Sequence, residues 1–300
     1  MKQFKYIGNI TPEELETQIV FPCFDEDGYR CILIKNAFEK TVVTKYETDN
    51  MIIKMNTKLQ FESKDYYFHI ITSKNVDHDD IKSFDLIYEY IFTKIDNAVS
   101  DDTLAMVVLS LEEYFRITPE KDSKKLQIGV WGELFCIEYL YDRGFQDVVE
   151  KYHNNFYFKH DIEISDSLRM EVKSTVDSKR IHHFRHDQIC RDDVSVIVCS
   201  IILEESQEGT SLLEMCNRIM SLMDDPDDKL NMSKIIRMCG LSEEKPGLSF
   251  SEGRAEEEIR FYSAKSLPMI TATIPNGVTK VSYDVDCSFG EEIDLNELPL

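Results

Sequence analysis

Short runs in which apolar and polar residues alternate fill the first 75 residues of the chain. Turn-forming residues separate them, for example at Asp25-Glu26-Asp27-Gly28. The period of two is typical of strands, and the pattern predicts a small antiparallel sheet or a partly closed barrel. The runs are Tyr29–Lys35, Thr41–Tyr46, Met51–Met55 and Tyr66–Thr72.

Apolar residues then recur at helical spacing over Asp79–Val99 and again over Asp101–Ile117. The polar stretch Thr118–Lys125 contains a proline, and we place a domain boundary there. The sequence therefore predicts a β-rich accessory domain with two helices over residues 1–118 and a second domain over residues 119–300.

The second domain is predicted to contain helix, three strands, helix and strand in that order, which is an α/β layer. These elements are a helix at Leu126–Arg143, a strand near Asp147–Tyr152, a hairpin at Asp161–Lys173, a helix near Phe184–Arg191 and a strand at Val194–Leu203. Later elements are helices at Ser211–Met223 and Ser233–Cys239 and a terminal hairpin of Met269–Ile274 with Val278–Val285.

The hairpin at Asp161–Lys173 carries the candidate chemistry. Side chains alternate faces along a strand, so Glu171 and Lys173 share one face while their apolar neighbours take the other. Asp161 is likewise opposite to the apolar face of the first strand. Carboxylate oxygens bind Mg²⁺, and a lysine ammonium can stabilise a charged transition state. Metal-assisted hydrolysis of a phosphodiester needs this set of groups.

The register of this hairpin decides whether the two acids meet. A two-residue turn at Asp166-Ser167 would pair Asp161 with Val172 and place it on the wrong face, because a one-residue slip reverses every side chain. We therefore predict a loop of three or five residues, or a bulge with the same effect, that sets Asp161 opposite Glu171.

Glu133 stands in the middle of a helix that is apolar almost all round. An ionised carboxylate left there without a partner would be costly. We expect it to point at Asp161 and Glu171, and we expect the crowding of three acids to raise a carboxyl pKa. The alternative is a buried structural acid paired with a lysine or arginine.

These residues resemble the signature of the PD-(D/E)XK nuclease superfamily. The matching positions are Asp161, the triplet Glu171-Val172-Lys173, Glu133 on the first helix and Gln188 on the next. The chain departs from the pattern at His160, where proline is common. The resemblance implies a restriction-endonuclease-like core in which Asp161, Glu171 and Glu133 hold Mg²⁺ or Mn²⁺. It also implies that Lys173 acts on the attacking water and that Gln188 supports the site.

A narrower resemblance covers most of the chain. Gly129-Val130-Trp131-Gly132-Glu133-Leu134 and the terminal Pro275-Asn276-Gly277-Val278 are similar to a bacterial PD-(D/E)XK family. Its genes stand beside restriction–modification or phage-defence genes. This resemblance implies a deoxyribonuclease of a defence system, with protein partners encoded nearby.

Charge is distributed unevenly along the chain. The formal net charge is -22, yet residues 121–200 hold 12 basic and 14 acidic side chains. Within them, Arg169–Arg191 holds six basic residues against three acids, which predicts a local DNA-facing surface. His182 and His186 belong to it, or ligate metal if they are helical. The acidic flanks favour a second hypothesis, a non-catalytic subunit that binds DNA or a partner protein.

The eight cysteines include no CxxC pair, so a zinc ribbon is not expected. The N-terminus lacks an apolar signal core, and the longest apolar run, Val194–Leu203, is about half a membrane span. These features predict a cytoplasmic protein with reduced thiols and no membrane association.

Overall fold

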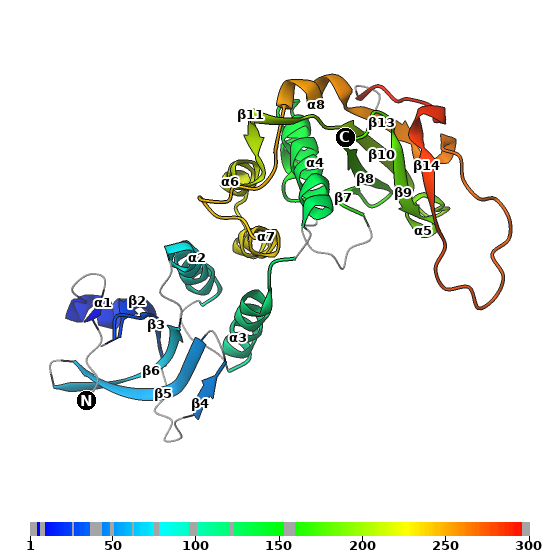
Figure 1. Ribbon diagram of the computed structural model, residues 1–300. Coiled ribbons are helices and arrows are strands. Elements are labelled where there is room, and N and C mark those ends of the chain that lie inside the picture. The colour runs from blue at the N-terminus through cyan, green and yellow to red at the C-terminus, as the bar shows by residue number, and fades with distance from the viewer. Residues whose placement is uncertain are drawn as a thin grey trace. The chain divides into compact units, whose positions relative to one another are not determined.

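The computed structural model describes residues 5–6, 10–25, 27–36, 44–48, 51–61, 63–74, 78–95, 101–120, 123–152 and 160–295 (Figure 1). The chain forms two compact units, Met1–Ile117 and Thr118–Leu300. Helices and sheets occur in both units, so the fold is α/β, as the sequence predicts.

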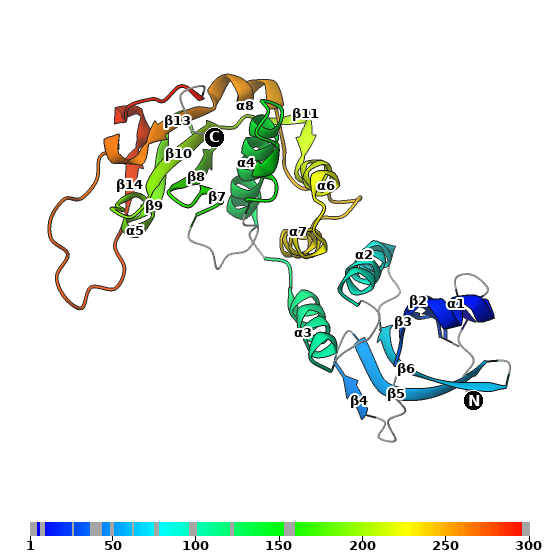
Figure 2. The same cartoon turned by 180° about the vertical axis from the view of Figure 1, so that it is seen from behind.

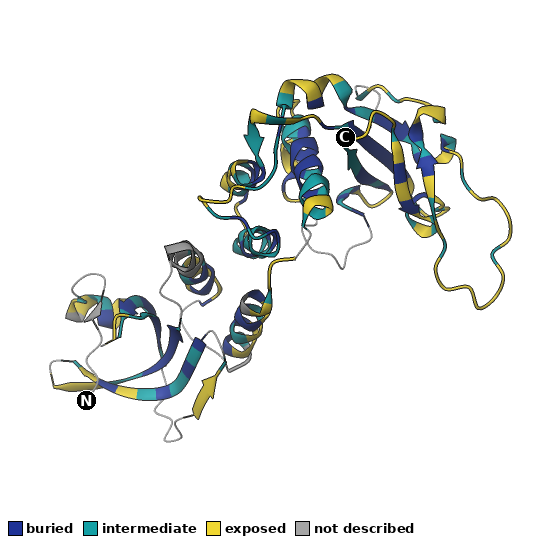
Figure 3. Ribbon diagram, in the orientation of Figure 1, coloured by how far each residue is buried: buried dark blue, intermediate teal, exposed yellow. Residues whose placement is uncertain are grey.

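The first unit contains a six-stranded antiparallel sheet in the order β1-β2-β3-β6-β5-β4. Cys31, Ile32, Leu33 and Ile34 of β3 are all buried, so both faces of the sheet are covered at its centre (Figure 3). The strands are β1 (Lys5–Tyr6), β2 (Val20–Phe24), β3 (Arg30–Lys35), β4 (Thr44–Glu47), β5 (Met51–Phe61) and β6 (Lys64–Ser73). The helices are α1 (Pro12–Thr17), α2 (His78–Lys94) and α3 (Asp101–Arg116).

The second unit is built around a four-stranded sheet in the order β13-β10-β8-β7. Strands β8 and β10 are parallel, and the other two pairs are antiparallel. The strands are β7 (Ile162–Ser165), β8 (Leu168–Thr175), β10 (Ser195–Ile202) and β13 (Arg260–Ser263). Two small sheets accompany it: β9 (Ile181–Arg185) with β14 (Ser282–Asp286), and β11 (Glu205–Ser211) with β12 (Ser249–Phe250).

Two different layers cover the faces of the four-stranded sheet (Figures 1 and 2). Ile197 and Cys199 of β10 join one core with helix α4. Val196 and Val198 point to the opposite face and join Phe184 of β9 in a second core. The α-helices of this unit are α4 (Lys124–Tyr141), α5 (His186–Ile189), α6 (Leu212–Leu222), α7 (Pro226–Met238) and α8 (Glu252–Glu258).

The strand predicted near Asp147–Tyr152 is wrong. Gln146–Val148 forms a 3₁₀ helix, and only Tyr152 makes an isolated bridge, to Ile162. Val148 and Val149 are both buried. Neighbouring residues of a strand point to opposite faces, so a strand with one covered face could not bury both.

The predicted terminal hairpin is also wrong. Residues 269–281 contain no strand, and β14 pairs with β9 in place of Met269–Ile274. This pairing lets Val285 and Phe184 pack in one core. An isolated two-stranded hairpin would be marginally stable and would offer no such burial.

The helix predicted near Phe184–Arg191 starts later and is shorter, at His186–Ile189. His182 and Phe184 are buried while Ile181, His183 and Arg185 are exposed. That alternation is a strand period, and it extends β9 to Arg185.

No helix in the described part of the chain combines the length and the apolar character needed to cross a membrane. All eight cysteines are free thiols.

Helix α4 lies against β8 at one close contact. A Cβ atom added to Gly132 would lie 2.5 Å from Cβ and 2.6 Å from Oγ of Ser174. The Ser174 hydroxyl also donates a hydrogen bond of 2.8 Å to the Ile128 carbonyl. Glycine at position 132 is therefore what allows the helix to approach the strand.

We predict that Gly132→Ala destabilises the second unit by about 1–3 kcal/mol, the usual cost of overpacking a core. Urea unfolding at fixed pH measures this change. Gly129→Ala on the same helix is the matched control, because nothing lies within 4 Å of its added Cβ. The control should gain roughly 0.5–1 kcal/mol from helix propensity. Adding Ser174→Gly to Gly132→Ala should restore most of the loss, and failure of this rescue would contradict the contact.

Candidate active site

A bulge in the β7–β8 hairpin sets the register of the candidate acids. Ser165 pairs with Leu168 across a two-residue turn, but Ile162 pairs with Met170, so the register shifts by one residue between them. Continued by one residue, this register sets Asp161 opposite Glu171. The structure thus reaches the predicted pairing through the bulge and not through a longer loop.

Asp161 directly precedes β7, next to the part of β8 that extends beyond the paired residues. Its Oδ2 accepts a hydrogen bond of 2.7 Å from the Val172 amide. Burial raises the pKa of Asp161 well above its ordinary value, and Glu171 and Glu133 raise it further. The three acids are therefore close enough to repel one another, as the sequence predicts.

Glu171 is the most deeply buried of the acids, with 1% of its surface exposed. Its Oε1 accepts hydrogen bonds from Lys173 Nζ at 2.5 Å and from Gln188 Nε2 at 2.8 Å. Its Oε2 is buried and has no hydrogen-bond partner among the described residues. One oxygen of this carboxylate is thus fixed by two donors while the other remains available.

Lys173 shares the face of Glu171, as expected from alternation. Burial lowers the pKa of Lys173, but Glu171 and Asp161 outweigh it and raise the pKa above its ordinary value. The ammonium also lies 5.6 Å from the centre of the Phe184 ring. The lysine therefore stays charged.

Glu133 reaches the same group of charges from helix α4. Its Oε2 accepts a hydrogen bond of 3.0 Å from the Tyr152 hydroxyl. Burial raises the pKa of Glu133 to about 7, and Glu171 adds to the rise while Tyr152 and Lys173 oppose it. The expectation that this acid lies near the hairpin acids is confirmed by these mutual effects.

Both the oxygen and the nitrogen of the Gln188 side-chain amide form hydrogen bonds. Its Oε1 accepts a hydrogen bond of 2.9 Å from the Arg185 amide, and its Nε2 donates to Glu171. Helix α5 thereby places the Gln188 amide nitrogen as a hydrogen-bond donor to the buried Glu171 carboxylate. All five residues singled out by the sequence meet in one place.

The histidine pair does not form a metal site. His182 lies in β9 with Nε2 2.8 Å from Ser200 Oγ, whereas His186 Nδ1 lies 3.0 Å from the Tyr283 hydroxyl. Burial and nearby Lys173 lower the pKa of His182 to about 4. His182 is therefore a neutral, structural side chain.

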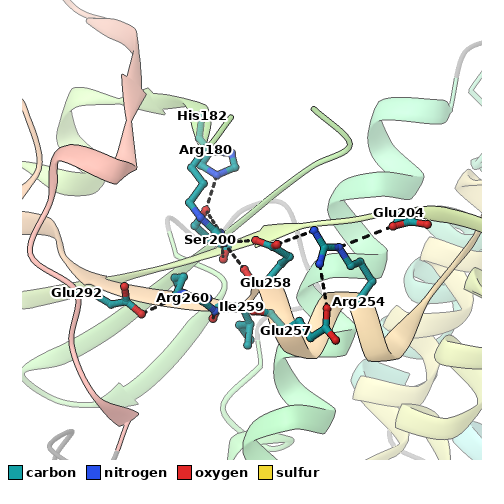
Figure 4. A network of polar contacts seen from close by, with 10 residues as sticks. All are labelled: Arg180, His182, Ser200, Glu204, Arg254, Glu257, Glu258, Ile259, Arg260 and Glu292. Atoms are coloured by element: carbon teal, nitrogen blue, oxygen red, sulfur yellow. Dashed lines mark hydrogen bonds and ion pairs between the residues drawn. The ribbon is translucent and has the colours of Figure 1, made fainter. Parts of the chain in front are cut away.

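On the sheet face that carries Glu171 and Lys173, His182 belongs to a polar network that ties β9 and β10 to α8 (Figure 4). Arg180 donates to the Ser200 carbonyl at 2.9 Å and to the Glu258 carboxylate at 2.9 Å. Arg254 contacts the same Glu258 at 2.8 Å. This network fixes Ser200 of β10, which pairs with Lys173 of β8, and so holds the strand next to the site.

The basic segment is largely engaged with acids. Its four arginines form ion pairs, Arg169 with Glu163, Arg180 with Glu258, Arg185 with Asp187 and Arg191 with Asp193. Exposed pairs are worth about 0–1 kcal/mol, so a polyanion can compete most readily for Arg185, which is 58% exposed, and least for Arg180, which is 10% exposed. Fewer basic side chains of this segment are available to bind DNA than the count of charges suggests.

The oxygen donors suit a hard divalent cation. Buried carboxylates with raised pKa values, and the unpartnered Glu171 Oε2, are groups that a cation would stabilise. Within the described residues, no three His, Cys, Asp or Glu side chains already enclose an ion position. Mg²⁺ commonly takes only one or two carboxylates and keeps several waters, so a complete protein cage is not required.

Three contributors were not identified from the sequence. Gly132 permits the approach of α4, Tyr152 holds Glu133, and His160 lies with Nδ1 3.4 Å from Glu171 Oε2. Gly132, next to Glu133 in the sequence, could have indicated a close approach of the helix to a strand. Tyr152 and His160 act through contacts that no periodicity indicates.

A family model described as "Putative PD-(D/E)XK family member" (DUF4420) matches residues 10–288. No curated protein and no solved structure matches the chain.

We predict that Glu133→Gln stabilises the metal-free protein above pH 7. The pKa of Glu133 rises from an ordinary 4.5 to about 7 in the fold. The folded state therefore holds more protons than the unfolded state between these values, and stability falls as pH rises through this range. Glutamine removes that loss, so the variant should exceed the wild type by up to a few kcal/mol at pH 8.

Urea unfolding in a chelator from pH 4 to pH 8 measures the difference between the two proteins. The comparison cancels other titrating groups such as His182. The difference should disappear toward pH 4. A difference that is the same at every pH would show that Glu133 does not titrate as assigned.

Proposed function

Because the chain belongs to the DUF4420 family of PD-(D/E)XK proteins, we propose that it is a divalent-metal-dependent nuclease that hydrolyses DNA phosphodiester bonds. The observation that carries the proposal is the convergence of Asp161, Glu171 and Lys173 beside the start of β7, with Glu171 bound to Lys173 and Gln188. In this proposal the second unit holds a restriction-endonuclease-like core, made of α4, β7, β8, β9, α5 and β10.

Asp161 and Glu171 are the proposed ligands of Mg²⁺ or Mn²⁺, and Glu133 extends the ligand set from the helix. Burial raises the pKa of Asp161 most, and repulsion from Glu171 and Glu133 adds to it; the repulsion supports this role, since a divalent cation relieves it. When bound, the ion would neutralise phosphate charge and make water a better nucleophile.

Lys173 is the proposed catalytic cation. Its ammonium is held by Glu171 and is charged, so it can orient the attacking water or stabilise negative charge on the phosphate. Gln188 holds Glu171 Oε1 in place, which leaves Oε2 for a cation.

DNA is the proposed substrate, and the basic residues of Arg169–Arg191 that reach the surface, above all Arg185, are the proposed phosphate contacts. They must exchange carboxylate partners for phosphates, which makes binding weak and sensitive to salt. A nuclease of this kind fits a restriction–modification or phage-defence system in which a protein partner encoded nearby supplies further DNA affinity.

We predict that Asp161→Ala and Lys173→Met both abolish cleavage for different reasons. Losing Asp161 removes an oxygen ligand, so Mg²⁺ affinity should fall. Losing Lys173 leaves the acids in place, so Mg²⁺ should bind at least as well, while turnover falls by roughly a hundredfold or more. Isothermal metal titration and single-turnover cleavage of plasmid and linear DNA measure the two effects.

Glu163→Gln is the matched control. This acid lies on the same strand as the site but pairs with Arg169 at 3.0 Å. The control should keep both metal affinity and cleavage. Unchanged Mg²⁺ affinity in Asp161→Ala, or full cleavage by Lys173→Met, would contradict the assigned roles.

A second candidate function is a non-catalytic subunit that binds DNA or a partner protein in a defence complex. The pairing of all four arginines with acids favours it, because few cations are left free to hold DNA. We predict for this case that the wild type neither binds Mg²⁺ or Mn²⁺ nor cleaves DNA. Assays with the products of neighbouring genes test both functions together.

A further inference from the structure

His160 is a buried side chain directly before Asp161, with 5% of its surface exposed. Its Nδ1 lies 3.4 Å from Oε2 of Glu171. Neither ring nitrogen has a hydrogen-bond partner among the described residues, and the same holds for Glu171 Oε2. Three unsatisfied polar atoms thus gather beside the proposed metal ligands.

This grouping is unusual for a folded protein. A buried polar atom without a partner costs about 1–3 kcal/mol, so most such atoms find one. Here the two residues fail to satisfy each other, because charge-assisted hydrogen bonds measure about 2.7–2.9 Å. A group that binds His160 Nδ1 and Glu171 Oε2 at once would satisfy two of these three atoms.

The 3.4 Å separation suits two ligands of one cation. Imidazole nitrogens and carboxylate oxygens lie about 2.0–2.2 Å from an ion such as Zn²⁺, which puts neighbouring ligand atoms roughly 3–3.5 Å apart. A neutral imidazole protonated at Nε2 presents its lone pair at Nδ1. Nδ1 is the nitrogen that faces Glu171.

We propose that His160 is a nitrogen ligand beside Glu171, so that the site takes a first-row transition-metal ion in preference to Mg²⁺. This inference rests on the proposed function, which supplies the carboxylate ligands. Imidazole adds little affinity for Mg²⁺, which favours oxygen. It adds more for Co²⁺, and affinity for mixed nitrogen and oxygen sites rises from Mn²⁺ to Co²⁺.

Calorimetric titration with Co²⁺ and with Mg²⁺ at fixed pH tests the preference. His160→Phe keeps a planar ring and removes both nitrogens, and His160→Asn is a smaller second variant. Each should weaken Co²⁺ binding about tenfold or more while changing Mg²⁺ binding by less than about threefold. His182→Asn is the control, since it removes a buried imidazole that contacts Ser200 and should leave the Co²⁺ preference unchanged.

Electron spin-echo modulation of bound Mn²⁺ gives a direct readout in the wild type, whether or not the variants fold. Labelling histidine with ¹⁵N should change the nitrogen modulation, and His182→Asn should keep it. Mn²⁺ binding without a histidine nitrogen signal would overturn the inference, because His160 would then only position Glu171. An equal loss of Co²⁺ and Mg²⁺ affinity in both variants would also overturn it, and in either case the proposed nuclease would stand. A wild type that binds no divalent ion would overturn both.

Discussion

A buried, ionisable carboxylate on the central strand is the constraint on which the second unit depends. Glu171 is almost fully enclosed, and an isolated charge there would cost several kcal/mol. Lys173, Gln188 and His160 come from three different segments, and each contacts this one side chain. Lys173 lies on β8 with Glu171, Gln188 on the short helix α5 and His160 just before β7, and the fold brings these segments together.

The gathering of charged side chains around Glu171 also requires α4 and the four-stranded sheet to approach closely. Gly132 lets α4 lie against Ser174, and the next residue, Glu133, then joins the charges around β8. Burying mutually repelling acids lowers stability, and the surrounding cores offset this through extensive apolar packing. Local conflict of this kind, inside an otherwise consistent fold, is what functional sites commonly show.

Much of this could be predicted from the sequence. Alternation along β8 gave the shared face of Glu171 and Lys173, and the requirement that Asp161 join them predicted a loop of three or five residues or a bulge, of which the structure has the bulge. Helical spacing placed α4 and its acid. The failures have one cause. The strand at β9, the pairing of β14 with β9 and the turn at Val148-Val149 are decided by contacts between distant segments, which local periodicity does not contain.

The raised carboxyl pKa values connect protons and cations at the site. Burial, with a smaller contribution from Glu171, raises the pKa of Glu133 to about 7, so near neutral pH this carboxyl holds a proton in roughly half of the folded molecules. A divalent cation favours the ionised forms and therefore releases such protons when it binds. The Lys173 ammonium does not replace such a cation, because it already contacts Glu171 while Asp161 is still repelled by Glu171 and Glu133. With all three acids ionised against the one lysine, the cluster would carry a net charge of -2 (3 acids, 1 lysine), which a divalent cation offsets.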